Sequence, residues 1–230
     1  MKILNWEVIL WDCLEEMDKL IEQWVKVDAI ITDPPYLLDN HWGWIKTREL
    51  HRNLAEKHID FISNSFDENC LEKMLKLCNI PNILLFCSNK QVSWLMNYFE
   101  NRKLSTTLLV WNKYDCVPFW NWKYIEDIEF IVYVRWKKAP FNNLSVQEKS
   151  KVKRFSKAEW KRLHPTQKPI LLMEELIKTH SNKWDIVLDC FSGSWTTWLA
   201  AQNLNRNYIL IEKEEKYYNI IKQRLWITMN

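Results

Sequence analysis

Glycine is nearly absent from this 230-residue chain, which contains 2 Gly and 15 Trp. Gly ordinarily makes up about 7% of a globular protein. Tight turns and helix ends need backbone with positive φ, which Gly adopts freely and Trp does not. Several Trp stand at positions where a turn favours Gly, for example Trp6, Trp122 and Trp184. The shortage of Gly and the excess of Trp therefore point to one common explanation.

The codon UGA offers that explanation, because some variant genetic codes read it as Trp and others as Gly. Translation with the wrong code would write Trp at Gly positions. We favour this interpretation, in which most of the 15 Trp are Gly in the natural protein. The alternative is a protein that is truly rich in Trp. A chain with 2 Gly would have difficulty forming its turns, which weighs against that alternative.

Other absences narrow the class of protein. The chain has no run of 18 apolar residues, so we expect no membrane-spanning helix, and its first residues show no signal-peptide pattern. Its six Cys contain no Cys-X-X-Cys pair, so we expect neither a disulfide framework nor a zinc site. Several Cys lie in apolar runs and are interpreted as buried thiols of a cytoplasmic protein. With 47% hydrophobic residues, the chain is expected to fold as a single domain over residues 1–230.

Apolar, β-rich segments alternate with helical patterns along most of the chain. The expected strands cover 7–11, 27–32, 82–87, 105–111, 128–134, 186–190 and 207–211. The expected helices cover 13–24, 69–79, 90–101, 170–181, 196–204 and 214–226. Seven alternating strands predict an α/β fold with a mostly parallel, Rossmann-like sheet and helices on both faces. Segments 105–111 and 128–134 have no helix between them, so we expect them to form an antiparallel pair.

Two segments interrupt this alternation. Residues 37–65 are polar and irregular, and residues 135–163 are basic. Between residues 135 and 168, eleven Lys and Arg stand against two Glu, a net charge of +9, whereas the whole chain carries +3. Such segregation suits a polyanionic partner such as nucleic acid. A solvated loop explains the basic segment equally well.

The first candidate site is Asp33-Pro34-Pro35-Tyr36, which directly follows the apolar segment 27–32. In open α/β sheets, ligands bind at the carboxyl ends of the strands. The Asp33 carboxylate and the rigid carbonyls of the two Pro are acceptors that could hold an exocyclic amino group. Tyr36 offers a flat face for stacking on a base. The alternative is an Asp-Pro turn that only ends a strand.

The second candidate site runs from Asp189 to Trp198, between the strand expected at 186–190 and the helix that follows. With Gly in place of its two Trp, this stretch is a Gly-rich turn from strand to helix. Such a turn lets the backbone approach a cofactor closely. Glu212 closes the next strand, 19 positions after Gly193. An acidic residue at about this spacing commonly binds ribose hydroxyls.

Two further groups of residues lie at expected loops. The stretch HPTQKP at 164–169 places the Thr166 hydroxyl and the Lys168 ammonium in one rigid turn before a helix. The alternative for its His is a residue at the surface or near the helix cap. Asp12 and Cys13 follow the first strand. Asp12 either caps the next helix or accepts a hydrogen bond from an adenine amino group.

Taken in this order, the motifs at 33–36, 164–169 and 189–197 resemble those of the DNA amino-methyltransferases of the permuted β class. Three motifs in the family's order and spacing are more specific than any one alone. The resemblance extends from about Trp11 to Arg224. It implies a seven-stranded sheet that binds S-adenosyl-L-methionine (AdoMet), with a circularly permuted motif order. The DPPY form of the first motif implies methylation of adenine at N6.

The resemblance also implies a role for each motif residue. Asp33 and the Pro34 carbonyl would accept hydrogen bonds from the adenine N6 amino group, with Pro35 beside them and Tyr36 stacked on the flipped-out base. The residues implied to hold AdoMet are Asp12 and Cys13 at its adenine, Glu212 at its ribose, and Thr166, Lys168, Asp189, Phe191, Gly193, Ser194, Trp195 and Thr196 at or near its methionine end. No metal is implied.

The implied substrate is double-stranded DNA, with segments 37–65 and 135–163 as its variable, DNA-facing parts. A cognate restriction endonuclease and a second copy of the chain are further partners that the resemblance allows. Three other functions stay open. They are cytosine-N4 methylation, methylation of RNA or protein amides, and a DNA-binding relic whose cofactor pocket is filled by Trp195.

Three Trp depart from the family pattern. Trp195 stands where the family has a Gly against the cofactor, and Trp11 stands at a Gly position before Asp12. Trp198 is expected to crowd its helix against the sheet. Trp111 differs from these because the family has Trp in that strand, so we expect it to be genuine.

Overall fold

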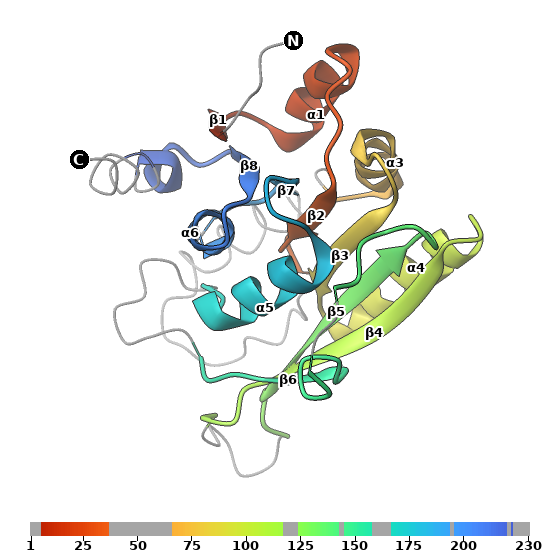
Figure 1. The fold of residues 1–230 in the computed structure, drawn as a ribbon, viewed down its shortest axis with the longest axis vertical. Helices are drawn as coiled ribbons and strands as arrows, with labels where there is room; N and C mark the ends of the chain where they lie inside the picture. The colour runs from red at the N-terminus through yellow and green to blue at the C-terminus, as the bar shows by residue number, and fades with distance from the viewer. Residues whose placement is uncertain are drawn as a thin grey trace, which may run out of the picture.

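The computed structural model describes residues 6–36, 66–116, 124–142, 145–157, 167–193, 196–219 and 222. These residues form one eight-stranded sheet with helices on both sides (Figure 1). The strands are β1 (Trp6–Leu10), β2 (Ala29–Thr32), β3 (Asn82–Cys87), β4 (Ser105–Asn112), β5 (Ile128–Arg135), β6 (Val152–Arg154), β7 (Ile186–Asp189) and β8 (Asn207–Glu212). The helices are α1 (Cys13–Glu22), α3 (Glu68–Leu77), α4 (Asn89–Glu100), α5 (Ile170–His180) and α6 (Thr196–Asn203).

The strand order is β1-β8-β7-β2-β3-β5-β4-β6. Strands β1, β8, β7, β2 and β3 run parallel to one another, and β5 runs antiparallel to both β3 and β4. The mostly parallel sheet and the antiparallel β4–β5 pair are therefore confirmed. The described residues contain one strand more than the seven expected. The extra strand is β6, which lies inside the basic segment and pairs with β4.

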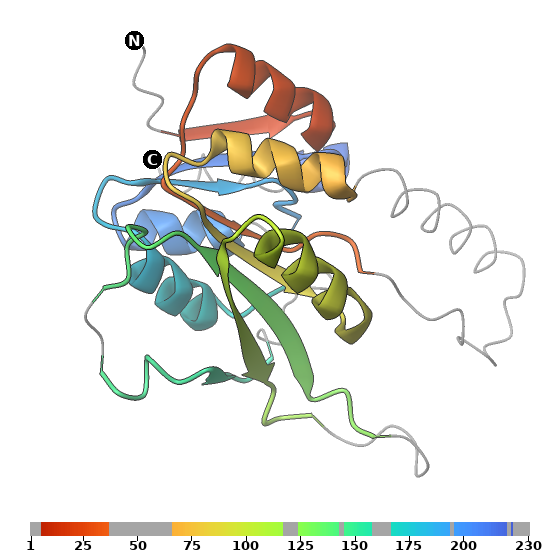
Figure 2. The ribbon, with the colours of Figure 1, turned by 90° about the vertical axis from the view of Figure 1, so that its right-hand side faces the viewer.

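Helices cover both faces of the sheet. Helices α1, α3 and α4 pack on one face, and α5 and α6 pack on the other (Figure 2). Strand β3 serves both layers, because Ile83 and Leu85 join the first core cluster while Leu84 and Phe86 join the second. A strand buried on both faces reads as a continuous apolar run, which is why NILLFC is easily identified from the sequence.

The structure describes two of the three positions at which we expected a turn to need Gly, Trp184 and Trp6, and they differ. Trp184 has φ of 73° at the third position of a turn that the Asp185 N–H closes onto the Asn182 carbonyl. A positive φ at this position favours Gly, so the predicted turn is confirmed. The prediction for Trp6 is wrong, because Trp6 begins strand β1. Trp122 lies outside the described residues.

A second Trp with left-handed backbone escaped the sequence analysis. Trp24 has φ of 58° just after α1, where the Val25 N–H donates to the Leu20 carbonyl at 2.9 Å. This bond reaches back five residues and is typical of a helix end that uses Gly. The side chains of Trp24 and Trp184 are 85% and 65% exposed. Burial of so little of either indole does not offset the free-energy cost of the left-handed backbone.

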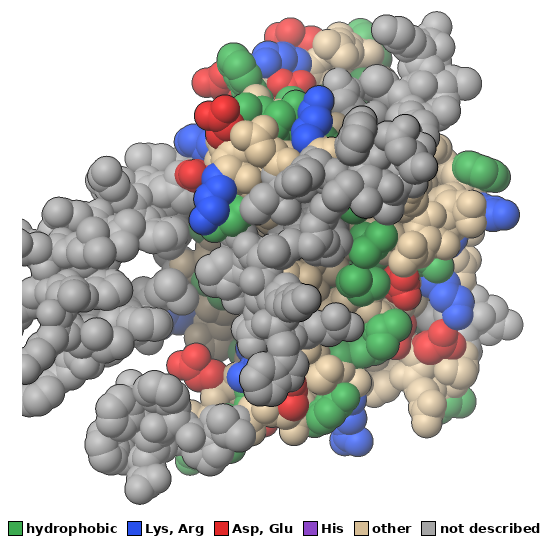
Figure 3. Space-filling view, turned by 90° about the vertical axis from the view of Figure 1, so that its left-hand side faces the viewer, with side chains coloured by type: hydrophobic (Ala, Val, Ile, Leu, Met, Phe, Trp, Pro, Cys, Tyr) green, Lys and Arg blue, Asp and Glu red, His purple; other side chains and the backbone are tan. Residues whose placement is uncertain are grey.

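The basic segment is partly built into the fold. Lys153, on β6, is buried, and its ammonium lies 2.6 Å from the Glu175 carboxylate on α5. On the face drawn in Figure 3, the described Lys and Arg side chains are interspersed with Asp and Glu.

Among the described residues, no helix is both long and apolar enough to cross a membrane.

Candidate active site

Three neighbouring strands end at one place, and each ends in an acidic residue. Asp189 is the last residue of β7, Glu212 is the last residue of β8, and Asp33 directly follows β2. Because β8, β7 and β2 are adjacent and parallel, their carboxyl ends meet at one edge of the sheet. The first two candidate motifs, far apart in the sequence, are thereby brought together.

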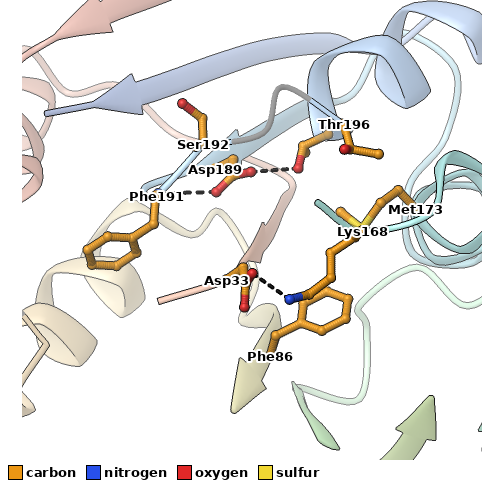
Figure 4. Close-up of a pocket in the computed structure, with 10 residues that line it drawn as sticks. Asp33, Phe86, Lys168, Met173, Asp189, Phe191, Ser192 and Thr196 are labelled. Carbon is orange, nitrogen blue, oxygen red and sulfur yellow. Dashed lines mark hydrogen bonds and ion pairs between the residues drawn. The ribbon is translucent and has the colours of Figure 1, made fainter. Parts of the chain in front are cut away.

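A small cavity of about 70 Å³ lies at this edge, beside the ends of β2, β3 and β7 (Figure 4). It is lined by Asp33, Phe86, Lys168, Met173, Asp189, Phe191, Ser192, Gly193, Thr196 and Thr197. The lining contains residues from all three principal motifs predicted from the sequence. Thr166, Ser194 and Trp195 lie outside the described residues, so their predicted contacts with a cofactor stay predictions.

The Asp33 carboxylate uses only one of its two oxygens. Its Oδ2 lies 2.5 Å from the ammonium of Lys168, as Figure 4 shows. Its Oδ1 is buried and has no hydrogen-bond partner among the described residues. Burial raises the pKa of Asp33, while the charge of Lys168 opposes that rise. The site therefore presents a desolvated acceptor that a ligand carrying N–H groups would satisfy.

Lys168 contacts the candidate motif at 33–36, whereas the sequence placed it only near the cofactor. Its ammonium lies 3.0 Å from the carboxylate of Glu129 and 3.3 Å from the Tyr36 hydroxyl. Burial alone would lower the pKa of Lys168, but Asp33 and Glu129 outweigh it and raise that pKa. Lys168 is thus held as a cation between two carboxylates.

Asp189 is held by neutral groups. Its Oδ1 accepts hydrogen bonds from the Thr32 hydroxyl at 2.6 Å and from the Phe191 N–H at 3.1 Å. Its Oδ2 accepts from the Thr197 hydroxyl at 2.5 Å. Burial raises the pKa of Asp189 to about 6. These bonds fasten β2, the loop after β7 and the start of α6 to one carboxylate, so Asp189 shapes the loop.

The loop and the last strand supply the features expected of a cofactor site. Gly193 has φ of 25°, and it is the described Gly with positive φ. The Ser192 N–H bonds the Ile211 carbonyl at 3.0 Å, which ties the loop to β8. Glu212 is only 7% exposed and accepts from the Glu214 N–H at 2.7 Å. Burial raises the pKa of Glu212 to about 7. A buried carboxylate beside a Gly-containing loop fits a ligand with hydroxyl groups and a close backbone approach.

Asp12 acts as a helix cap. Its Oδ1 accepts from the Leu14 N–H at 2.9 Å at the start of α1, and its Oδ2 lies 3.1 Å from the ammonium of Lys213. The capping interpretation is confirmed, and contact with an adenine stays a prediction. Cys13, the first residue of α1, is buried.

The described Trp of the cofactor region behave differently from one another. Trp198 is buried in the second core cluster, and its indole N–H donates to the Tyr208 hydroxyl at 2.8 Å. The core therefore accommodates the Trp198 indole, which was expected to crowd α6 against the sheet. Trp11 is 47% exposed and donates to Glu15 at 2.7 Å, clear of the cavity lining. Trp111 is buried and donates to the Phe155 carbonyl at 2.9 Å, as a genuine core Trp would.

Comparison with known proteins decides the family. The profile of the N6/N4 DNA methylases matches residues 27–223, which is most of the chain. This chain is an N6/N4 DNA methylase. The DNA methylase family that the motifs resemble is thereby confirmed, and the permuted motif order stays a prediction.

Individual relatives of this methylase agree with that assignment. The Type II methyltransferase M.HinfI of Haemophilus influenzae is 28% identical over 245 residues, covering 95% of this chain and 67% of the relative. The crystal structure of the M1.HpyAVI–SAM complex is 31% identical, with a TM-score of 0.73, and the match covers 95% of this chain and 98% of that one. The PvuII DNA methyltransferase, described as cytosine-N4-specific, shares the fold at 15% identity and a TM-score of 0.71, over 96% of this chain and 86% of that one.

Sequence reasoning missed Phe86 and Met173 in the cavity lining and two polar residues beside it, Thr32 and Glu129. Thr32 gave no signal because it looks like any β-branched residue of a strand. Glu129 is a single acidic residue at the start of β5, and its partners Tyr36 and Lys168 come from distant loops. Its position near the start of a mainly apolar strand was the one available sign.

Proposed function

We propose that this methylase transfers a methyl group from AdoMet to the N6 amino group of an adenine in double-stranded DNA. The observation that carries this proposal is the buried, unpartnered Oδ1 of Asp33. An exocyclic amino group has two N–H donors. Asp33 would accept one of them and the Pro34 carbonyl the other, which turns the nitrogen lone pair toward the methyl donor.

Tyr36 and the base pocket complete the proposed substrate site. A base inside a duplex is out of reach of the sheet edge, so the target nucleotide must be flipped out. Tyr36, anchored through its hydroxyl, would stack on the flipped base, with Pro35 fixing the turn between them. The DPPY form of the motif, which resembles that of adenine-N6 enzymes, favours adenine over cytosine.

AdoMet supplies an electrophilic methyl group on its sulfonium when it is bound. In this proposal Phe191, Gly193 and Thr196 line its methionine end, as do Ser194 and position 195, with Asp189 holding the loop in shape. Thr166 and Lys168 would contribute near that end. Glu212 accepts hydrogen bonds from the ribose hydroxyls, and Asp12 with Cys13 borders the adenine ring.

A role in restriction-modification is the biological setting that we propose. The relatives that cover most of this chain are named Type II methyltransferases. DNA would contact segments 37–65 and 135–163, as variable parts of one domain over residues 1–230. The cognate endonuclease and a homodimer are partners that this setting allows.

Nucleoside mass spectrometry of methylated DNA tests the proposal. The purified protein is incubated with AdoMet and unmethylated double-stranded DNA, and the digested DNA is analysed for both methylated bases. The expected product is N6-methyladenine. N4-methylcytosine without N6-methyladenine would reassign the substrate, since cytosine carries the same kind of amino group. A protein that binds DNA but neither binds AdoMet nor transfers methyl groups would instead be the DNA-binding relic.

A further inference from the structure

Glu129 lies outside the cavity lining, yet it contacts three groups around the catalytic motif. Its Oε2 lies 3.0 Å from the Lys168 ammonium and accepts a hydrogen bond from the Tyr36 hydroxyl at 3.0 Å. Its Oε1 lies 2.7 Å from the ammonium of Lys113, at the end of β4. Both carboxylate oxygens of Glu129 are therefore fully engaged.

These contacts close a cluster without net charge. Asp33 and Glu129 contribute two negative charges, and Lys168 and Lys113 contribute two positive ones. Burial alone would raise the pKa of Glu129, but the two Lys outweigh it and hold that pKa below its ordinary value. A partly buried cluster of this kind is stable only while every member keeps its partner.

We propose that Glu129 is a positioning residue for methyl transfer, which holds Lys168 and Tyr36 so that Lys168 binds only Oδ2 of Asp33 and leaves Oδ1 for the target amino group. This inference rests on the proposed function of Asp33. It assigns a role to a residue that touches neither the target base nor the cofactor.

The count of donors on Lys168 explains why Glu129 is needed. An ammonium group has three N–H donors, and in this site they face Asp33 Oδ2, Glu129 Oε2 and the Tyr36 hydroxyl oxygen. Loss of the Glu129 charge weakens the hold on one of these donors, because a neutral acceptor binds an ammonium less strongly than a carboxylate does. Oδ1 of Asp33 is a buried acceptor without a partner, on the same carboxylate that Lys168 already contacts. Lys168 would then occupy the acceptor that the substrate must use.

The test compares Glu129→Gln with a matched control, Glu175→Gln. Glu175 pairs with Lys153 at 2.6 Å, and the side chains in that pair are 18% and 5% exposed. The Glu129–Lys168 pair has almost the same exposures, 20% and 5%. Both variants break a partly buried Glu–Lys pair, but only Glu129→Gln alters the groups around Asp33. We expect Glu129→Gln to lower kcat at least tenfold with AdoMet affinity within about twofold of wild type, and Glu175→Gln to keep both.

The pH profile of kcat separates positioning from a structural role. The titratable or charged groups around Asp33 are Lys168 before α5, Tyr36 after β2, Glu129 on β5, Asp189 on β7 and Cys87 on β3. The charge of Glu129 raises the pKa of Asp33, so its loss lowers that pKa. The acid limb of the profile, where Asp33 becomes protonated, should therefore move to lower pH in Glu129→Gln and stay in place in Glu175→Gln.

Lys113→Gln provides a second test if Glu129→Gln does not fold. This variant removes a cation that Glu129 shares, so Glu129 draws Lys168 more strongly and the pKa of Asp33 rises. The acid limb should then move to higher pH, opposite to the shift in Glu129→Gln. An unchanged kcat and acid limb in both variants would overturn the role of Glu129. A wild-type protein that binds AdoMet and DNA but forms no N6-methyladenine would overturn the proposed function instead.

Discussion

The two halves of the active site hold their carboxylates in opposite ways. On the β2 side, Asp33 is paired with the cation Lys168 and leaves one oxygen without a partner. On the β7–β8 side, Asp189 and Glu212 are buried and bound by hydroxyl and backbone N–H groups. Neither Asp189 nor Glu212 has an ion pair with a Lys or Arg among the described side chains, in contrast to Asp33.

This difference separates the two halves by their response to pH. Neutral donors stabilise a buried carboxylate less than a cation does, so the pKa of Asp189 rises to about 6 and that of Glu212 to about 7. The proposed cofactor half therefore titrates near neutral pH. Burial raises the pKa of Asp33 as well, but Lys168 opposes that rise, so the proposed substrate half depends in addition on an intact set of charges.

The largest expected effect follows from removing the centre of the charged half. Asp33→Ala should lower kcat by at least about 10³-fold, since the target amino group loses its acceptor. DNA affinity should fall little, because phosphate contacts dominate it. Asp18→Ala, which removes a 54% exposed carboxylate on α1, serves as the control. Single-turnover kinetics and DNA-binding titration measure the two effects, and equal losses of both would place Asp33 in the fold instead.

Removing the cation of the charged half, Lys168, should lower the free energy of unfolding. Lys168→Met leaves Asp33 and Glu129 as neighbouring carboxylates without their shared cation, which should destabilise the fold by about 3 kcal/mol at pH 8. The pKa of both carboxyls then rises in the folded state. Protonation relieves the repulsion, so the loss should shrink as the pH falls towards 5. Urea unfolding at both pH values measures this, and a loss of equal size at both would contradict it.

In the half of the site that holds its carboxylates with neutral groups, AdoMet binding should depend on pH. The pKa of Glu212, about 7, lies above that of an ordinary Glu, so the unliganded folded state binds a proton more tightly than the unfolded chain. Its contribution to stability is greatest below the unfolded pKa and is lost as the pH rises through 7. Ribose hydroxyls require the ionised form, so AdoMet affinity should fall about tenfold between pH 8 and pH 6.

Calorimetric titration at the two pH values checks this prediction. Glu212→Gln is the control, because an amide does not titrate over this range. Its AdoMet affinity should be weaker than that of wild type at pH 8 and nearly independent of pH. A wild-type affinity that is equal at both pH values would show that Glu212 does not bind the ribose as a carboxylate.

The smallest expected effect lies outside both halves. Trp184→Gly should stabilise the protein by about 1 kcal/mol, because left-handed backbone costs a residue other than Gly about 1–2 kcal/mol and the exposed indole buries little. Trp111→Gly should instead destabilise it by about 3–5 kcal/mol, since it empties a buried site. Urea unfolding of the two variants compares them, and a loss of stability in Trp184→Gly would support a genuine Trp there.

Mass spectrometry of the protein from its native host decides the origin of these Trp directly. Trypsin should release residues 184–206, bounded by Lys183 and Arg206, with three Trp positions in one peptide. We expect Gly at these positions, and Trp at all of them would reject the codon explanation. If position 195 proved to be Trp, the DNA-binding relic would become the stronger proposal for the function.

The sequence predicts the parts of this molecule that depend on local pattern. Strand β3 is predicted at its observed bounds because an apolar run between two turns has one plausible conformation. The motifs around Asp33 and Asp189 are predicted for the same reason, as each follows such a strand. Strand β6 is missed, because three residues with two charges show no alternation and acquire their structure only by pairing with β4.

The contacts between motifs could not be predicted in the same way. Nothing near Lys168 in the sequence shows that its ammonium ends on Asp33, since that pairing depends on how α5 packs against the sheet. Glu129 is harder still, because its role exists only once β5 lies beside the turn that carries Tyr36. Tertiary structure creates these pairs, and sequence spacing does not record them.

In the proposed function, the unpartnered oxygen of Asp33 would also select against a deaminated base. Deamination converts adenine to hypoxanthine and replaces the amino group with a carbonyl oxygen. Two acceptors would then face each other without water between them, a mismatch that sites of this kind reject by a factor on the order of 10⁴. A deaminated adenine lacks the nitrogen that accepts the methyl group, and this mismatch would also keep it from occupying the pocket, even with the surrounding sequence and the phosphate contacts intact.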